Sequence, residues 1–143
     1  MPEIETKLDK MGYRLPPPPP SAGNYLPANR SGNIMWLAGV GSRTADGGGT
    51  TGKLGSDLSV EEGYEAARWC AMNLLSRMKA ELGDLDRVAR ILKVVGMVNS
   101  APDFTQQARV VDGASDLFVA LYGDRGRHAR SAPGMGALPG NTA

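Results

Sequence analysis

The clearest hydrophobic pattern in the chain lies between residues 60 and 82. Apolar residues recur there at spacings of three and four, at Val60, Tyr64, Ala67, Ala71, Leu74, Leu75, Met78 and Leu82. This spacing predicts a long helix with one apolar stripe. Ser59 and Glu62 form a capping-box pattern before the stripe. Gly83 follows it, where a C-terminal glycine belongs, so both ends of the helix are marked.

Two strand-like stretches precede this helix, at residues 25–28 and 33–40. Turn-forming residues at 30–33 lie between them, which predicts a hairpin. Residues 41–56 are polar and rich in glycine, as expected of a loop.

The second half of the chain repeats the alternation of sheet and helix. Residues 88–98 are rich in Val, Ile and Leu and predict a sheet element. Residues 104–122 predict a second helix, with 111–113 as a candidate interruption, and 129–138 a last strand that Pro133 weakens. The order strand, strand, helix, strand, helix, strand predicts an α+β domain with a crossover and two helices on one face of the sheet.

The first 20 residues differ from the rest. Residues 4–11 predict a short helix that Gly12 ends, and five consecutive prolines follow at 16–20. Such a run adopts polyproline II and does not join a central strand. We interpret it as a stiff spacer and keep an SH3-type ligand as the alternative. The expected organisation is therefore an N-terminal helix and spacer over residues 1–20 and one domain over 21–143.

Composition narrows the class of protein. The 143 residues suffice for one domain with its own core. A net charge of +1 leaves no electrostatic footprint for nucleic acid or an anionic membrane. The chain has no apolar stretch of transmembrane length, no signal-peptide pattern, and a single cysteine, which together favour the cytoplasm. With only one histidine, we expect no cysteine and histidine metal site.

The glycine-rich stretch at residues 47–53 imitates a phosphate-binding loop. It satisfies G-x-x-x-x-G-K, but Leu54 stands where such a loop needs Ser or Thr for magnesium. The helix that should begin at once begins only near Ser59. We therefore interpret the stretch as a flexible connection.

Three further candidates have ordinary explanations. Arg125, Arg127, His128 and Arg130 form a short basic cluster, typical of a solvated turn with one structural arginine. The sequence shows no serine or cysteine nucleophile beside His128, so that histidine has no assigned role. Cys70 lies in the long helix beside the apolar stripe and is expected to be a packed thiol.

Several motifs, in order along nearly the whole chain, resemble one known family. The most specific is Gly126-Arg127-His128-Ala129-Arg130-Ser131-Ala132, followed by Leu138-Pro139. It is similar to the C-terminal signature of the RidA/YjgF family, the reactive intermediate deaminases once called endoribonuclease L-PSP. Residues 19–25, 57–64, 83–88, 98–104 and 113–117 resemble a longer subgroup of the same family.

The resemblance implies a chorismate-mutase-like (YjgF-like) α+β fold, with a mixed sheet and two helices packed on one face. It also implies a homotrimer with clefts between subunits, and hydrolysis of small 2-imino or 2-enamino acids to 2-oxo acids and ammonia without a cofactor. Two alternatives remain open. One is a module that binds a small carboxylate without turnover, and the other is an endoribonuclease, which the neutral charge disfavours.

The resemblance assigns the site residues as well. Arg130 is expected to grip the substrate carboxylate, because a guanidinium presents a planar fork that matches it. Tyr25 matches a tyrosine of the site, and Gly39 a glycine whose backbone lies near the substrate. Ala38 stands where many members carry serine.

The chain departs from the family pattern in other places. Ala132 replaces a common cysteine and Val40 a common glutamine. The family's final strand, which ends near a glutamate that orients the attacking water, is expected to be missing after Leu138-Pro139. The water-positioning role therefore has no candidate in the sequence, and weak activity is expected.

Overall fold

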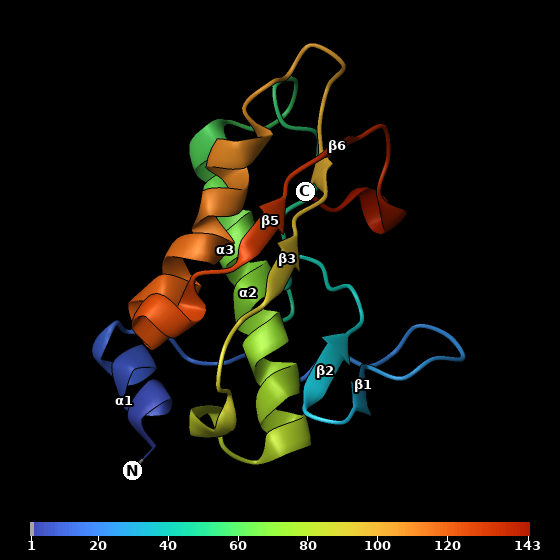
Figure 1. Cartoon of the computed structure of the whole chain (residues 1–143). Coiled ribbons are helices and arrows are strands. Elements are labelled where there is room, and N and C mark those ends of the chain that lie inside the picture. The colour runs from blue at the N-terminus through green and yellow to red at the C-terminus, as the bar shows by residue number, and fades with distance from the viewer. Residues whose placement is uncertain (1) are drawn as a thin grey trace.

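The computed structural model describes residues 2–143 as an α+β fold. Its helices and strands, in chain order, are α1 (Glu3–Lys10), β1 (Ala28–Ser31), β2 (Ile34–Leu37), α2 (Val60–Leu82), η1 (Leu85–Arg87), β3 (Lys93–Val95), β4 (Val98–Asn99), α3 (Gln107–Tyr122), η2 (Gly123–Gly126), β5 (Ala129–Ser131), β6 (Gly134–Met135) and η3 (Pro139–Asn141). Figure 1 shows α2 and α3 side by side on one face of β3 and β5. The α+β class and the pair of helices on one face are thus confirmed.

The long helix forms as its sequence predicts. The Ser59 hydroxyl accepts a hydrogen bond from the Glu62 amide, and the Glu62 carboxylate accepts one from the Ser59 amide, each at 3.2 Å. These bonds satisfy donors that have no partner inside the first turn. Gly83 ends the helix at φ 82°, a conformation that suits glycine.

The second helix, α3, is continuous through Val111, Asp112 and Gly113, so the suspected interruption is wrong. Gly113 has a packing role instead. A Cβ atom built on it would lie 2.0 Å from the Tyr64 carbonyl oxygen. Glycine therefore lets the backbones of α2 and α3 approach each other where they cross.

The strands are shorter than predicted and pair in three separate ladders. β1 and β2 form an antiparallel hairpin, whereas β3 pairs in parallel with β5 and β4 in parallel with β6. Helix α3 connects both parallel pairs, which confirms the predicted crossover. Antiparallel and parallel pairing are thus both present, as expected of a mixed sheet, but they are divided among three two-stranded sheets.

The first hairpin is displaced from its predicted place. β1 begins at Ala28 rather than Tyr25, and Ser31 faces Ile34, which leaves only Gly32 and Asn33 in the turn. Gly32 has φ 58°, which suits the first position of a two-residue hairpin turn. The prediction placed the turn two residues too early because it treated Arg30 and Ser31 as turn residues.

The two later sheet elements are interrupted for local reasons. Residues 88–92 are not a strand, because the Ile91 amide and the Val88 carbonyl bond to Arg125 instead. Gly96 separates β3 from β4, and Val111 lies so close that a Cβ atom on Gly96 would be 2.5 Å from it. Pro133 likewise separates β5 from β6.

The core lies among the three helices. Its buried residues from α1, α2 and α3 include Ile4, Leu8, Ala71, Met72, Leu75, Met78, Ala114, Leu117, Phe118 and Leu121. Part of the predicted stripe on α2 belongs to it, at Ala71, Leu75 and Met78. Polar residues of α2 are buried as well, because the segment that contains the proline run and the β1–β2 hairpin covers its other side.

That covering segment, residues 16–43, supplies backbone carbonyls to α2. The Ser76 hydroxyl donates to the Pro16 carbonyl, and Arg77 donates to the carbonyls of Ala38 at 3.1 Å and Pro19 at 3.3 Å. Buried polar groups need such partners. The proline run therefore lies along α2.

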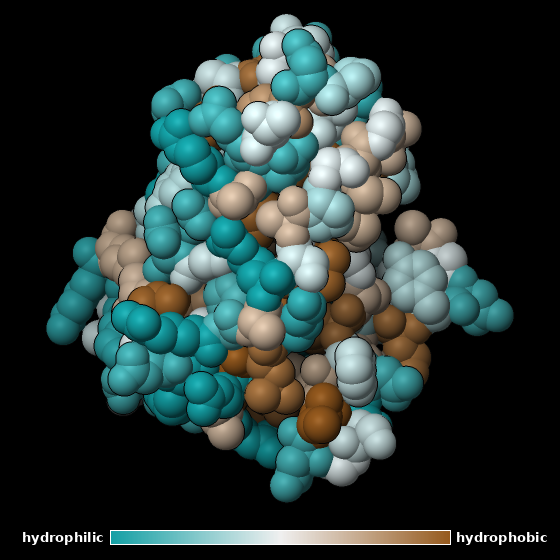
Figure 2. Space-filling model, turned by 45° about the horizontal axis from the view of Figure 1, so that its top comes forward, coloured by the Kyte–Doolittle hydropathy of each residue, from teal (hydrophilic) through white to brown (hydrophobic). Residues whose placement is uncertain are grey.

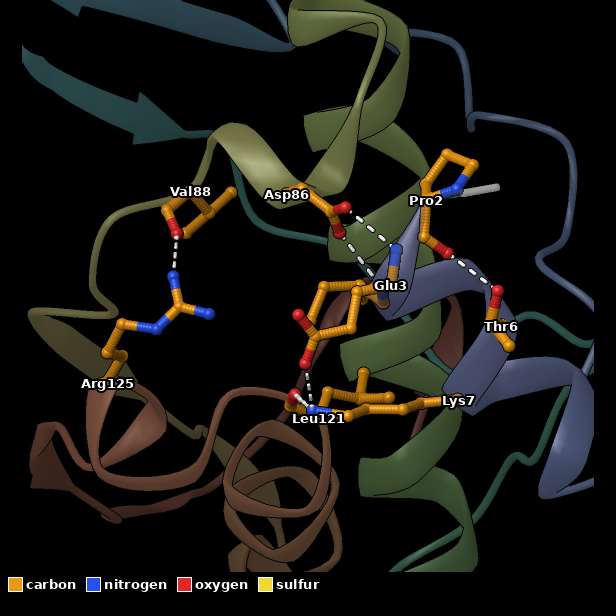
Figure 3. A network of polar contacts seen from close by, with 9 residues as sticks. Pro2, Glu3, Thr6, Lys7, Asp86, Val88, Leu121 and Arg125 are labelled. Atoms are coloured by element: carbon orange, nitrogen blue, oxygen red, sulfur yellow. Dashed lines mark hydrogen bonds and ion pairs between the residues drawn. The ribbon is translucent and has the colours of Figure 1, made fainter.

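Helix α1 is attached through polar groups at its first turns (Figure 3). The Asp86 carboxylate accepts hydrogen bonds from the amides of Glu3 at 2.7 Å and Ile4 at 2.9 Å. These bonds lower the pKa of Asp86. Lys7 donates to the Leu121 carbonyl at 3.0 Å, which ties α1 to the end of α3. No helix among the described residues combines the length and apolarity of a membrane span.

Candidate functional site

Arg130 lies at the centre of β5 and directs its guanidinium toward α3. Nη1 donates to Asp112 Oδ1 at 2.7 Å and to Ser115 Oγ at 3.1 Å, and Nη2 donates to the Ala108 carbonyl at 3.3 Å. Ala108, Asp112 and Ser115 are spaced by four and three residues, so one face of α3 presents all three. The helix and β5 together fix the arginine.

These bonds leave part of the guanidinium available. An arginine has five N–H donors, and three are used by Asp112, Ser115 and Ala108. One N–H on Nε and one on Nη2 have no partner within residues 2–143. The side chains of Arg130 and Asp112 are 24% and 46% exposed. Solvent or a small anion can therefore reach this ion pair.

His128 completes the same cluster. Its Nε2 lies 2.9 Å from Ser115 Oγ, and its Nδ1 lies 2.7 Å from the Gly126 carbonyl oxygen. Because a carbonyl can only accept, Nδ1 carries the hydrogen, and in the neutral ring Nε2 then accepts from the serine hydroxyl. The ring also meets the edge of Phe118, with centroids 6.0 Å apart.

Ser115 was not a predicted site residue, and the prediction that no serine nucleophile stands beside His128 is wrong. Ser115 comes 13 residues earlier in the chain, inside a helix whose pattern drew attention only to its apolar positions. Gly126 makes the contact possible. A Cβ atom on it would lie 2.2 Å from the Phe118 carbonyl oxygen, so only glycine lets the chain pass this close to α3. That approach brings His128 to Ser115.

The other predicted site residues lie elsewhere in the chain. The Tyr25 hydroxyl accepts a hydrogen bond from the Ala22 amide at 3.2 Å, and its side chain is 49% exposed. Ala38 binds Arg77 through its carbonyl, and Gly39 faces open space. Figure 1 shows the segment before β1 well apart from β5. No hydrogen bond or ion pair within residues 2–143 joins Arg130 to Tyr25, Ala38 or Gly39.

A groove beside the cluster runs between α2 and α3. It is lined by Val60, Glu61, Tyr64, Glu65, Arg109, Asp112 and Asp116. Asp112 thus belongs both to the groove and to the Arg130 cluster. The Tyr64 hydroxyl donates to Asp116 at 2.7 Å, and this bond, with burial, raises the pKa of Tyr64 to about 12.

Lys53 of the glycine-rich loop and Cys70 of α2 both have structural surroundings. Lys53 donates to Asn99 Oδ1 at 3.0 Å and to the Gly136 carbonyl at 2.5 Å, so its ammonium ties the glycine-rich loop to later segments. Burial raises the pKa of the Cys70 thiol to about 12, so a reactive thiolate is not formed near neutral pH. Within residues 2–143 no cluster of three or more His, Cys, Asp or Glu residues is arranged to hold a metal ion.

Comparison with known proteins agrees with this architecture. The family model described as YjgF/chorismate mutase-like, putative endoribonuclease, matches residues 5–142. Protein TCP17 of Trypanosoma cruzi is 44% identical over 137 residues, which cover 95% of this chain and 86% of that protein.

Two solved structures resemble the chain over nearly its whole length. The crystal structure of Atu1372 from Agrobacterium tumefaciens, a protein of unknown function, superposes with a TM-score of 0.90 at 39% identity, covering 98% of this chain and 87% of that one. A protein from Shewanella oneidensis described as a putative endoribonuclease gives a TM-score of 0.94 at 31% identity, covering 97% and 92%. The chain therefore belongs to the YjgF/chorismate mutase-like family.

Proposed function

We propose that this protein is a hydrolytic deaminase of small 2-imino or 2-enamino acids, and that Arg130 binds the substrate carboxylate. The observation that carries the proposal is the state of Arg130. Three of its donors are held by α3, and two remain for a ligand. A guanidinium fixed in this way loses little side-chain freedom on binding, and its two free N–H groups can bond both oxygens of a carboxylate.

The chemistry that follows is simple. The carboxylate bound to Arg130 fixes the neighbouring imine carbon in place, and water attacks that carbon. Ammonia leaves and a 2-oxo acid remains. The reaction needs only the positioning of substrate and water and the transfer of protons.

We also propose that the protein acts as a homotrimer. Ile34 and Trp36 of β2 and Val95 of β3 are exposed, with Trp36 67% accessible, whereas the alternate residues Met35 and Val94 pack against the core. The β1–β2 and β3–β5 pairs therefore each turn an apolar side away from the core. Figure 2 shows hydrophobic residues reaching the surface in the lower half of that view. Further copies of this chain would cover that face and could bring Tyr25 of one subunit toward Arg130 of another.

Light scattering tests the assembly. We expect a mass near three times the 15.1 kDa of the chain, and we expect Trp36→Glu to shift the protein toward smaller species. A wild-type mass near 15.1 kDa would reject the trimer and any site between subunits.

Activity is tested by producing 2-aminoacrylate or 2-iminobutanoate with a dehydratase and following the release of the 2-oxo acid. We expect the wild type to accelerate release and Arg130→Ala to lose about a hundredfold or more, since each hydrogen bond to a charged group contributes about 1.5–3 kcal/mol. Arg127→Ala is the matched control, because Arg127 is exposed and its side chain pairs within residues 2–143 only with Asp124. Equal release with and without the wild-type protein would reject the deaminase.

A carboxylate-binding module and an endoribonuclease would each give a different experimental result. If the protein binds 2-oxobutanoate in titration calorimetry without accelerating hydrolysis, and Arg130→Ala abolishes the heat, it is a carboxylate-binding module. The description of its relatives as putative endoribonucleases motivates one more assay. Cleavage of labelled RNA that Arg130→Ala removes would support that activity over deamination.

A further inference from the structure

We infer that Ser115 and His128 form a proton relay that activates the water attacking the imine carbon, an inference that rests on the proposed deaminase function. The structure brings a hydroxyl and an imidazole together beside the arginine proposed to bind the carboxylate.

The hydrogen bonds of Ser115 leave one acceptor lone pair of its hydroxyl for a water molecule. A serine hydroxyl has one donor and two acceptor lone pairs. The donor goes to His128 Nε2 at 2.9 Å, and one lone pair accepts from Arg130 Nη1 at 3.1 Å. The second lone pair has no partner within residues 2–143. A water molecule that donates to it is held by the group that can take its proton.

His128 is held in the form that such a relay needs. The Gly126 carbonyl, 2.7 Å from Nδ1, keeps the hydrogen on that nitrogen, so Nε2 faces Ser115 as an acceptor. The edge contact with Phe118 fixes the ring from a second direction. A base within hydrogen-bond reach of a hydroxyl and oriented by a third group is the arrangement that activates serine in hydrolases.

The position of the relay fits the reaction. The imine carbon is bonded directly to the carboxylate that Arg130 would hold, and Arg130 touches Ser115. Arg130 therefore links the proposed carboxylate site to the serine that would hold the water. Asp112 completes the arrangement, because it holds the same Nη1 at 2.7 Å and keeps the guanidinium against the serine.

The proton steps balance. As the water oxygen bonds to C2 of the protonated imine, the π electrons of the C=N bond move to nitrogen. The water proton passes to Ser115 Oγ while the serine proton passes to His128 Nε2, which gives a carbinolamine and an imidazolium. The imidazolium returns its proton through Ser115 to the amino group. The C–N bond then breaks with its electron pair, the hydroxyl loses its proton to form C=O, and ammonium and the 2-oxo acid are released.

The experiment measures kcat and KM for 2-iminobutanoate hydrolysis in the 143-residue chain and in single-residue variants of it. We expect Ser115→Ala and His128→Gln each to lower kcat roughly a hundredfold, which lies within the range of general acid–base catalysis, with KM changed far less. Ser115→Thr keeps the hydroxyl and should retain most of the activity. Thr105→Ala, which removes an exposed hydroxyl just before α3, is the control and should match the wild type.

A purely structural role gives a different result. His128→Ala leaves a space beside Phe118, and added imidazole should restore at least part of kcat through a relay but cannot repair a lost structural tie. Circular dichroism and thermal melting establish that each variant is folded.

The outcomes separate the two proposals. If the wild type accelerates hydrolysis and Arg130→Ala does not, while folded Ser115→Ala and His128→Gln keep the wild-type kcat, the relay is overturned and the deaminase stands. A rise in KM at constant kcat, or no rescue by imidazole, also overturns it. If the wild type gives no acceleration, both proposals fail.

Discussion

Two polar regions, one at the C-terminal end of α3 and one beside its first nine residues, use charged side chains in different ways. Around α1, three charged groups bind backbone: Asp86 accepts from two amides of α1, Lys7 donates to the Leu121 carbonyl, and Arg125 donates to the Val88 carbonyl (Figure 3). Two ion pairs, Lys7–Glu3 and Lys79–Glu5, lie beside them. Around Arg130, side chains mostly bind other side chains, at Asp112, Ser115 and His128.

The difference separates a structural network from a candidate site. A hydrogen bond from a side chain to a backbone carbonyl or amide joins two segments. It leaves the side chain little freedom to rearrange. The Arg130 cluster instead contains two unused N–H groups, an unused lone pair and a hydroxyl proton shared with an imidazole. Those are the groups that a ligand and a proton transfer require.

The largest expected effect comes from Gly113→Ala, which would disturb both regions. The new methyl group would lie 2.0 Å from the Tyr64 carbonyl oxygen, so α3 must move away from α2. We expect the free energy of unfolding, from urea titration, to fall by about 3 kcal/mol or more. Both α1 docking and hydrolysis should weaken, because α3 holds partners of both regions.

Gly136→Ala is the matched control for that change. Nothing lies within 4 Å of the methyl group that it would add, so its effect should stay within about 0.5 kcal/mol. If Gly113→Ala were as stable as Gly136→Ala, the close crossing of α2 and α3 would be contradicted.

Asp86→Asn isolates the first region. Loss of the carboxylate that accepts from the Glu3 and Ile4 amides should lower the melting temperature by a few degrees and expose α1 to proteolysis. Hydrolysis per folded molecule should not change. Loss of activity in the folded variant would show that the two regions are not independent.

The effect of Asp86 should depend on pH in one direction. Hydrogen bonds from the Ile4 and Glu3 amides lower its pKa in the folded protein below the ordinary 3.8. The stabilisation is therefore present in full above pH 3.8 and is lost as pH falls through the lower folded pKa. The gap in melting temperature between wild type and Asp86→Asn should narrow only in acid.

Elements were predictable from the sequence where the residues that determine them lie close together along the chain. Helix α2 was predictable because Ser59, Glu62 and Gly83 act within one turn of its ends. The exact strands were not, since Val88 and Ile91 bind Arg125 rather than a neighbouring strand.

The candidate site shows the same limit. Arg130 was found through a family motif, which is local in sequence. No sequence pattern around Ser115 indicated a site, because its contact with His128 forms only when Gly126 lets the chain approach α3. The predicted neighbours Tyr25 and Gly39 remain predictions, since their meeting with Arg130 depends on how copies of the chain assemble.

Asp112→Asn probes the second region with a moderate expected effect. The pair with Arg130 is partly exposed, so its loss should change the free energy of unfolding by less than about 1 kcal/mol. The guanidinium would be less fixed, and we expect KM for the imine to rise roughly fivefold, equivalent to about 1 kcal/mol. Asp116→Asn, four residues further along α3, should leave KM unchanged. Equal KM in both variants would contradict the role of Asp112.

The smallest expected effect belongs to Asp116 itself, which binds a neutral phenol rather than a cation. Its hydrogen bond with Tyr64, together with burial, raises the pKa of Tyr64 to about 12. Asp116→Asn should therefore let Tyr64 ionise at lower pH, closer to the ordinary 10.0. A raised folded pKa means that this stabilisation is complete below pH 10 and disappears as pH rises through about 12. Tyrosinate absorbance measures the change, with Tyr64→Phe identifying the signal. An unshifted titration in Asp116→Asn would show that Asp116 does not bind the phenol, and that the contrast between Asp112 and Asp116 has another cause.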